Sequence, residues 1–418
     1  MNNLSKSAPR FSYPLATLQQ ISRDILDHAK LGGATACECN VSDGFGQTVP
    51  VRQNEVETIE YNRDKGLSVT VYIGQKRGNA STSDFSPQAI NDTVAAALSI
   101  ARYTAEDDCA GLADPKLFAQ AFPDLDLYHP RTLPVEDAIQ LARTCEAAAL
   151  AVDKRISNSE GASVSLSESQ FIYANSLGFM GGYPLSRQSV SCSVIAQQDK
   201  AMQRDYWYSV ARDVVDLEPV DVVGKKAGER TIARLGARKI PTCEAPVLFE
   251  AQVAASLMNH FVGAVSGSSL YRKSSFLLDS VGKQIFAADI QIRELPFTKK
   301  GLASGVFDDE GVATVERNVV ENGVVQGYFL SSYSARKLGL QTTGNAGGSH
   351  NLVLENGAPE DFTALLKKMD KGLLVTELMG QGVNGVTGDY SRGASGFWVE
   401  GGEIQYPVEE ITIAANVK

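Results

Sequence analysis

The stretch 318–330, with the sequence NVVENGVVQGYFL, decides the fold class that the sequence predicts. Two runs of β-forming residues flank Asn322-Gly323, and this dipeptide strongly indicates a hairpin turn because both of its residues accept positive φ. The stretch 396–408, GFWVEGGEIQYPV, repeats the arrangement around Gly401-Gly402. Because a tight hairpin joins antiparallel strands, this part of the chain predicts antiparallel sheets.

Upstream of these hairpins, segments with helical periodicity alternate with groups of short β-like runs. Helices are expected over residues 15–29, 86–104, 134–155 and 219–235, the second with Ser86-Pro87 as its N-cap and first residue. Runs such as TACECNV and QTVPVRQ, or SVSLSES and QFIYANS, alternate apolar and polar residues and predict separate short strands in a meander or antiparallel sheet.

Helices and strand clusters that follow each other without regular βαβ alternation predict an α+β fold with largely antiparallel sheets. The boundary is expected near Lys239, where a charged helical segment gives way to proline and a β run. We therefore expect two domains, residues 1–238 with helices and antiparallel sheets, and residues 239–418 with a β-rich, hairpin-containing fold.

Composition and charge narrow the classes of function. Of the 418 residues, 43% are hydrophobic and 21% charged, which indicates a globular rather than a disordered chain. The net charge of -10 repels phosphate backbones, so direct nucleic-acid binding is not expected. No stretch is apolar enough for a membrane span, and the start of the chain shows no apolar leader segment, so we expect a cytoplasmic protein.

Six scattered cysteines agree with a reducing compartment. Cys37 and Cys39 alternate on a strand-like stretch, so both thiols are expected to face the same side.

One histidine lies in the middle of an apolar helical run, LMNHFVGAVSGSS at 257–269. Zinc peptidases of the HExxH kind need a glutamate next to the first histidine and a second histidine one turn later. His260 is followed by Phe261, and Ala264 and Val265 stand where a second ligand is needed, so the sequence predicts no zinc site here. We expect His260 to be half-buried and hydrogen-bonded at the edge of a packed helix face.

The sequence contains no G-x-S-x-G elbow and no phosphate-binding glycine motif. The acidic stretch FDDEG at 307–311 is interpreted as a solvated turn. A glycine-rich loop at 342–351, TTGNAGGSHN, lets another backbone approach closely, which suits either a peptide or a tight turn. The peptide-binding hypothesis comprises this loop and a second segment of turn-forming residues: Thr343, Gly344, Asn345, Gly347, Asp389, Tyr390, Ser391 and Arg392.

Several longer segments resemble the PmbA/TldE proteins of the TldD/PmbA family, known as modulators of DNA gyrase. The resemblance spans nearly the whole chain and is carried by DFSPQAINDTVAAALSIARYT, YRKSSFLLDSVGKQIF, GLASGVFDDEGV, SSYSARKLGL, TTGNAGG and the block LLVTELMGQGVNGVTGDYSRGASGFWVEGGEIQYPVEEITIA. Members of the family continue beyond the strand with which this chain stops, so the family-typical C-terminal tail is expected to be absent.

The resemblance implies a role in a heteromeric cytoplasmic protease. In that family the sister chain, TldD, carries HExxxH and is the zinc subunit, whereas PmbA-type chains lack the motif. Carried over residue by residue, His260 matches the first histidine, Phe261 the glutamate and Val265 the second histidine. The implied chain has no metal or catalytic residue of its own, and zinc is expected in a TldD-like partner. The implied substrates are unfolded peptides, including antitoxins and a microcin precursor.

Two alternatives stay open. The first is a stand-alone metallopeptidase whose ligands come from dispersed residues such as His260, His350, Glu377 and Asp389. The second is a non-enzymatic binding protein that regulates gyrase or a carbon-storage regulator.

Overall fold

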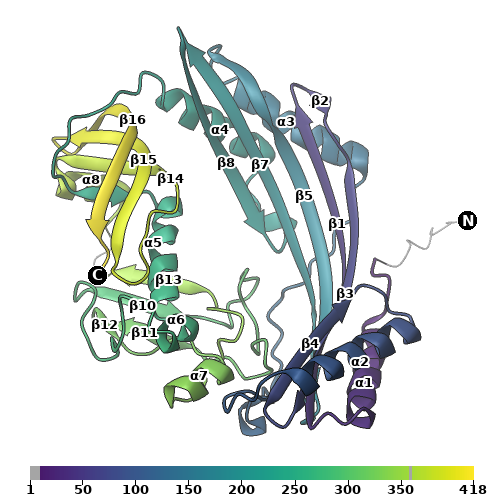
Figure 1. Cartoon of the computed structure of the whole chain (residues 1–418). Coiled ribbons are helices and arrows are strands. Elements are labelled where there is room, and N and C mark those ends of the chain that lie inside the picture. Colours follow the sequence, from purple (N-terminus) through teal and green to yellow (C-terminus); the bar gives the residue numbers. More distant parts are fainter. Residues whose placement is uncertain (1–9, 357–359) are drawn as a thin grey trace, which may run out of the picture.

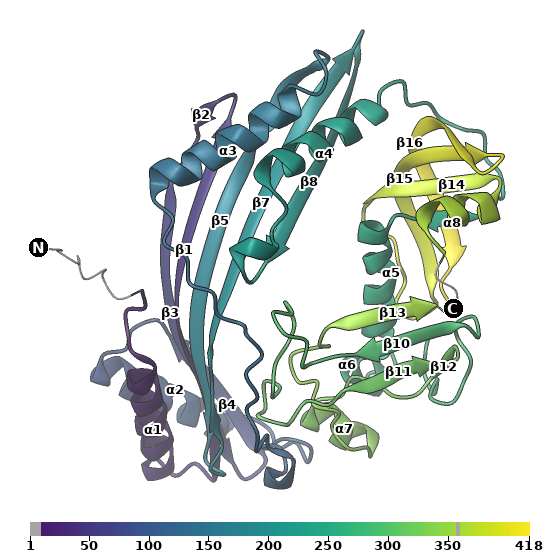
Figure 2. The same cartoon turned by 180° about the vertical axis from the view of Figure 1, so that it is seen from behind.

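The computed structural model describes residues 10–356 and 360–418. A wide curved sheet forms one side of the molecule, and the C-terminal part of the chain forms the other side with two smaller sheets (Figures 1 and 2). Strands pair antiparallel in all three sheets, with a single parallel pair in the third. The predicted α+β class is thereby confirmed. The leader argument also drew on residues 1–9, which lie outside the described part.

The wide sheet has the strand order β4-β3-β1-β5-β7-β8, with β2 paired to β1 and β6 to β5. Its strands are β1 (Ala36–Arg52), β2 (Glu55–Val56), β3 (Glu60–Ile73), β4 (Lys76–Thr82), β5 (Ile156–Asn175), β6 (Met180–Gly181), β7 (Pro184–Gln198) and β8 (Ala201–Ala211).

The prediction of separate short strands in this region is wrong. β1 continues through Gly44 and Gly46 and pairs on one side with β3 and on the other with β5. The polar residues and glycines in its middle interrupt the apolar alternation, but pairing on both sides satisfies their backbone groups. Asp43 and Gln47 are consequently buried within a continuous strand.

Helices cover one face of the wide sheet at both of its ends (Figure 2). α1 (Leu15–Leu31) and α2 (Pro87–Tyr103) pack on one end, while α3 (Val135–Leu150) and α4 (Val220–Ala233) pack on the other. These helices confirm the predicted positions to within a few residues at each end, except that α3 stops five residues before the predicted end. Ser86 caps α2 as expected, since its hydroxyl accepts a hydrogen bond from the Ala89 amide at 3.3 Å.

Polar residues fill the middle of the same face, between the two helix pairs. The carboxylate of Glu168 is 3% exposed and accepts hydrogen bonds from Arg10 at 2.6 Å and from the Tyr128 hydroxyl at 3.0 Å. Gln170 donates to the Tyr13 carbonyl at 2.6 Å. These chain segments are distant from β5 in sequence. They cover this face between the two helix pairs, and their hydrogen bonds satisfy the buried polar groups there.

The C-terminal part contains two four-stranded sheets and the helices between them. The first sheet consists of β10 (Ile290–Glu294), β11 (Arg317–Glu321), β12 (Val324–Val325) and β13 (Leu352–Asn356), and the second of β9 (Val247–Phe249), β14 (Gly372–Met379), β15 (Asp389–Glu400) and β16 (Glu403–Asn416). The helices are α5 (Ala251–Ala264), α6 (Gly267–Tyr271), α7 (Ser332–Leu338) and α8 (Phe362–Met369), while short 3-10 turns occur upstream at η1 (Pro115–Leu117) and η2 (Val214–Asp216).

Both predicted hairpins are confirmed. Asn322 and Gly323 join β11 to β12 with φ of 50° and 76°, and Gly401-Gly402 joins β15 to β16.

The C-terminal part joins the wide sheet at two separate places. At one end, an aromatic cluster unites both parts of the chain, with Phe307 packed edge-on against Phe179 and Tyr183 at centroid distances of 5.2 and 5.8 Å. At the other end, Arg230 pairs with Glu250 at 2.6 Å, and Arg234 pairs with Glu377 at 2.6 Å.

Between these junctions lies the uncovered face of the wide sheet, called the open face below. It consists of the even-numbered residues of β1 between 40 and 50 and the side chains that pair beside them on the neighbouring strands.

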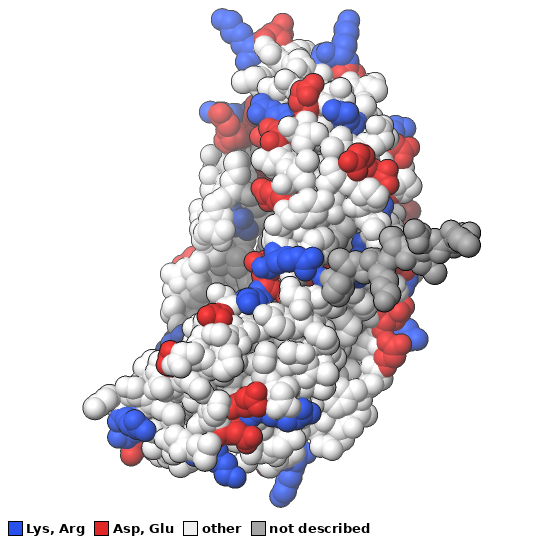
Figure 3. Space-filling view, turned by 90° about the vertical axis from the view of Figure 1, so that its right-hand side faces the viewer, with Lys and Arg blue, Asp and Glu red and all other residues white. Residues whose placement is uncertain are grey.

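Two surface properties follow from the structure. No helix among residues 10–356 and 360–418 is long and apolar enough to cross a membrane. Basic and acidic side chains are interspersed over the face shown in Figure 3, with uncharged surface between them.

Cys37 and Cys39 are both buried on the same side of β1, as predicted, and burial raises the pKa of the Cys39 thiol to about 12. Such a thiol is unreactive at neutral pH.

The close packing of α3 on α4 yields a stability prediction. A methyl group at Gly224 would overlap the Cys145 carbonyl of α3, whereas a methyl group at Gly263 of α5 would meet nothing within 4 Å. We expect Gly224→Ala to lower the free energy of unfolding by about 1–3 kcal/mol through overpacking. Gly263→Ala should raise it by up to about 1 kcal/mol through helix propensity. Urea denaturation of both variants checks this, and equal effects of the two would contradict the packing.

Candidate functional site

His260 lies on α5 and faces the sheet that contains β15. Its ring stands edge-on to the Tyr390 ring, with the centroids 6.0 Å apart and the planes at 82°. The side chain is half-buried, as predicted, but its Nε2 atom is buried without a hydrogen-bond partner. The predicted hydrogen bond is therefore not found at this atom, which leaves an unpaired polar group beside a sheet.

The two neighbouring motif positions belong to a hydrophobic core. Phe261 and Val265 are 5% and 0% exposed, and Phe261 packs edge-on against Phe286 at 5.1 Å. A spacing of five residues also turns Val265 about 140° away from His260 on a regular helix. Neither side chain can ligate a metal ion or accept a proton, so α5 does not fit a zinc site of the HExxxH type.

Arg392 is the charged neighbour of His260. Tyr390 and Arg392 alternate along β15 and therefore point to the same side. Burial and the nearby positive charge of Arg392 lower the pKa of His260, which favours the neutral imidazole at pH 7. Tyr390 is 4% exposed, and both its Oη atom and the Nε atom of Arg392 are buried without hydrogen-bond partners.

Apart from His260, the dispersed residues considered as metal ligands have other partners. Glu377 pairs with Arg234, and Asp389 accepts a hydrogen bond from Thr387 at 2.6 Å. His350 Nδ1 lies 3.2 Å from Glu294 Oε1. Among the described residues, no group of three or more His, Cys, Asp or Glu side chains is placed to hold a metal ion. The structure thus does not assemble the ligand set of a stand-alone metallopeptidase.

The first half of the glycine-rich loop is anchored inside the protein. Thr343 donates to Asn345 Oδ1 at 2.7 Å, and Asn345 Nδ2 donates to Glu294 Oε1 at 2.7 Å. Gly344 has a φ of 70° and lies so close to Ala313 that an added Cβ would stand 2.7 Å from its carbonyl oxygen. The backbone that approaches this loop is therefore the chain's own.

Glu294 is the centre of this anchor and is 1% exposed. Arg317 donates to it at 2.7 Å, and the His350 amide donates at 2.8 Å. Burial alone raises the pKa of Glu294, but hydrogen bonds from His350 and the charge of Arg317 outweigh it and hold the pKa below its ordinary value.

The acidic stretch FDDEG is not a solvated turn, contrary to the prediction. Asp308 is 4% exposed, and its carboxylate accepts hydrogen bonds from the amides of Glu310, Val312 and Ala346 at 2.9–3.0 Å. Burial raises the pKa of Asp308 to about 7. The residue ties its own turn to the glycine-rich loop, a contact that no local pattern predicts.

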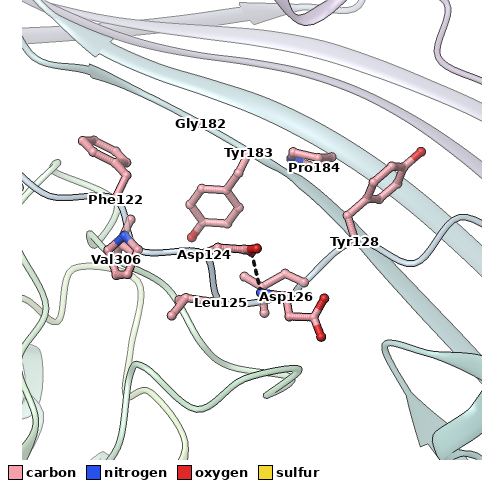
Figure 4. A pocket seen from close by; sticks show the side chains of 11 residues that line it. Phe122, Asp124, Leu125, Asp126, Tyr128, Gly182, Tyr183, Pro184 and Val306 are labelled. Atoms are coloured by element: carbon pink, nitrogen blue, oxygen red, sulfur yellow. Dashed lines mark hydrogen bonds between the residues drawn. The ribbon is translucent and has the colours of Figure 1, made fainter.

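Two cavities open where the C-terminal part meets the wide sheet. One, of about 310 Å³, is lined by Gly347 and His350 of the loop and by Arg212 and Tyr183 of the other part. The second, of about 330 Å³, lies beside it, and Figure 4 places Tyr183 between Phe122 and Tyr128 there.

The open face is rich in small polar side chains. Residues with half-buried or exposed side chains on it include Asn40, Ser42, Thr48, Ser163, Ser165, Ser167, Ser189, Ser191 and Ser193. Tyr206 and Tyr208, on the edge strand β8, are each 41% exposed and stack at 6.3 Å. A cavity of about 320 Å³ between Glu160, Arg204 and Tyr206 adjoins this face.

The residues of the peptide-binding hypothesis thus fall into four groups. Thr343, Gly344 and Asn345 hold the loop, and Gly347 borders a cavity. Tyr390 and Arg392 face His260, while Asp389 and Ser391 are exposed. Sequence reasoning missed the meeting of His260 with Arg392, because 132 positions separate them and only the packing of α5 on β15 brings them together.

Comparison with known proteins identifies the class. Models of three PmbA/TldA metallopeptidase domains match the chain: domain 1 at residues 37–101, the central domain at 128–235 and the C-terminal domain at 242–418. These matches define a metallopeptidase-type protein.

The relatives fix the family. The chain is 51% identical over 387 residues to the metalloprotease PmbA of Escherichia coli, covering 93% of this chain and 86% of that one. It belongs to the PmbA/TldD family. A crystal structure from Bacteroides thetaiotaomicron, described as a candidate modulator of DNA gyrase, superposes with a TM-score of 0.90 at 28% identity over 96% of this chain and 91% of that one. A TldD homologue of Haemophilus influenzae is 24% identical over 380 residues, covering 85% of this chain and 77% of that one.

The buried anchor of the loop yields a second prediction. Glu294→Gln leaves Arg317 without its counter-charge, so we expect the free energy of unfolding to fall by about 3 kcal/mol. Glu355→Gln is the matched control, because its pair with Arg293 at 3.7 Å is more than 40% exposed on both sides and should contribute less than about 1 kcal/mol.

Chemical denaturation at several pH values checks this prediction. Because the folded pKa of Glu294 is lowered, its contribution is present above the unfolded pKa of about 4.3 and is lost as the pH falls through the folded pKa. A Glu294→Gln chain that is as stable as wild type at pH 7 would contradict the anchor.

Proposed function

We propose that this chain is the metal-free subunit of a heteromeric cytoplasmic metallopeptidase and acts together with a TldD-like chain that holds zinc. The observation that carries the proposal is the composition of α5. Phe261 on α5 and Val265 directly after it are core residues with no ligand chemistry, although the family is named for metalloproteases. The chemistry of a metalloprotease needs a metal ion, but α5 of this chain does not fit one. Both observations agree if a second chain supplies the metal site.

The proposed substrates are unfolded or extended polypeptides, among them antitoxins and a microcin precursor. Support comes from the open face, whose small hydroxyl side chains leave room for a second backbone and offer hydrogen bonds. The edge strands β4 and β8 also present unpaired backbone groups to a partner or a substrate strand.

The cheapest test compares three samples: this chain alone, the TldD-like chain alone, and their mixture. We expect cleavage of an unfolded protein to be strongest in the mixture, to stop when a chelator removes zinc, and to be absent from this chain alone. Substituting the motif glutamate of the TldD-like chain should abolish the activity of the mixture. Chelator-sensitive cleavage by this chain alone would refute the proposal.

A regulatory binding role is the second candidate. It is favoured by the description of the Bacteroides structure as a candidate modulator of DNA gyrase. The net charge of -10 argues against any form of it that needs DNA contact. Affinity purification that recovers a gyrase subunit or a carbon-storage regulator, without a TldD-like chain, would favour this candidate.

A further inference from the structure

The cavity of about 310 Å³ beside the glycine-rich loop, called the loop cavity below, is lined by four side chains with acidic or basic groups: Arg212, Asp308, Asp309 and His350. Arg212 is engaged, because it donates to the carbonyls of Ser186 and Leu302 at 3.0 and 2.8 Å. Asp308 is engaged as well, since it accepts three backbone amides. The carboxylate of Asp309 forms no hydrogen bond or ion pair within the described part of the chain, although it lines the same cavity.

His350 presents one ring nitrogen to the loop cavity. Its Nδ1 lies 3.2 Å from Oε1 of Glu294, a carboxylate that is ionised at pH 7 and can therefore only accept. The proton of a neutral imidazole thus resides on Nδ1, and Nε2 keeps a free lone pair. Nε2 has no hydrogen-bond partner among the described residues, yet it is not fully buried. It is an acceptor with access to the cavity.

Asp309, Tyr183 and the Nε2 edge of His350 lie around one space. A Cβ added at Gly305 would stand 3.0 Å from the Tyr183 hydroxyl and 4.0 Å from Cδ2 of His350, the ring carbon bonded to Nε2. Partial burial raises the pKa of Asp309, and the nearby imidazole of His350 opposes this rise. Burial also raises the pKa of Tyr183, Arg212 opposes this, and Asp309 adds to it. Such mutual effects need short separations between the groups.

We propose that the loop cavity binds a primary ammonium group of the polypeptide that this subunit handles. The ammonium donates to the carboxylate of Asp309 and to Nε2 of His350, and its third N–H faces the hydroxyl oxygen of Tyr183. An ammonium has only donors, which the free acceptors require, and its charge balances that of Asp309. The inference rests on the proposed function and deepens it, since it names the part of the substrate that the cavity recognises.

Other ligand classes fit the loop cavity less well. A metal ion needs more ligands than Asp309 and His350 supply, and no group of three or more candidate ligands occurs among the described residues. An anion would meet the unpaired charge of Asp309, while the guanidinium of Arg212 is already directed at backbone carbonyls.

The loop cavity is reachable from the open face. Asn40 lines the cavity and belongs to the open face, and Asp309, Gly347 and Gly348 are exposed. Gly347 keeps the carboxylate uncovered, because an added Cβ would overlap Oδ2 of Asp309. An extended polypeptide on the open face can therefore place an ammonium group in this cavity.

The test measures binding of fluorescent extended peptides to the isolated full-length chain by anisotropy at pH 7. Three peptides share one sequence without lysine and carry the dye at the C-terminus: one with a free N-terminus, one acetylated, and one acetylated with a single internal lysine added. We expect at least one of the ammonium peptides to bind about tenfold more tightly than the plain acetylated peptide.

The source of the ammonium follows from the same series. Preference for the first peptide assigns the N-terminus, and preference for the third assigns a lysine side chain. At pH 9 an α-amino group has lost its proton whereas lysine has kept it. A preference for the free N-terminus should therefore largely disappear at pH 9, whereas a preference for lysine should persist.

Substitutions locate the binding. Asp309→Asn should abolish the preference, and Asp289→Asn, on an exposed aspartate outside the loop cavity, should leave it unchanged. His350→Asn should reduce it several-fold, because the amide of asparagine can replace Nδ1 as donor to Glu294 but supplies nothing at the place of Nε2. Since the Asp309 carboxylate has no partner to lose, Asp309→Asn should unfold at the same temperature as wild type.

Specific outcomes overturn the proposed ammonium site. Equal affinity of wild type for all three peptides, no measurable binding of any of them, or a preference that survives Asp309→Asn refutes it. A preference for the free N-terminus that is unchanged at pH 9 also contradicts an ammonium ligand. These assays use the isolated chain, so their failure refutes the ammonium site only, whereas absence of cleavage by the mixture refutes the proposed function.

Discussion

The structure depends on a wide antiparallel sheet that buries only one of its faces. Four helices and a set of buried polar contacts close that face. The C-terminal part packs on the other face through the aromatic cluster, and ion pairs tie it to the end of α4 beside the edge strand β8. At the ionic junction, Asp205 is 4% exposed and lies between Arg230 and Arg234, at 3.3 and 3.6 Å. Arg230 lies on α4 and Arg234 directly follows it. Because they pair onward with Glu250 and Glu377, this junction fixes the position of α5 relative to the sheet.

Two sides of α5 have different surroundings. Its buried side, with Phe261 and Ala264, belongs to the core beneath β10 and β11, while His260 faces β15 on another side. Since the two sides use different residues, the packing of α5 in the core does not depend on the residue at position 260. The positive charge of Arg392 beside His260 fits the same account, because a cation next to an imidazole disfavours binding of a second cation.

The sequence was sufficient to predict the elements that have strong local signals. Asn322-Gly323 and Gly401-Gly402 predicted their hairpins because these residues accept positive φ. Ser86-Pro87 predicted a helix start because the serine hydroxyl caps a backbone amide and the φ of proline already suits the first turn. The long strands were missed because Gly44, Gly46 and Asp43 resemble turn residues until both neighbouring strands are known.

The candidate site was harder to predict because its contacts are distant in sequence. Arg392 was singled out as a turn residue, but its meeting with His260 depends on the packing of α5 on β15. Asp308 became a buried anchor only through the amide of Ala346, from another loop. By contrast, the absence of ligand chemistry at Phe261 and Val265 could be predicted directly, because no environment makes these side chains coordinate a metal.

The central claim is the proposal that α5 of this chain forms no zinc site. The most direct measurement is the zinc affinity of the isolated full-length chain compared with that of His260→Ala, by titration against a chelating indicator at pH 7. The account predicts that the two curves coincide, since His260 holds no metal. A tight zinc site in the wild-type chain that disappears in His260→Ala would contradict it.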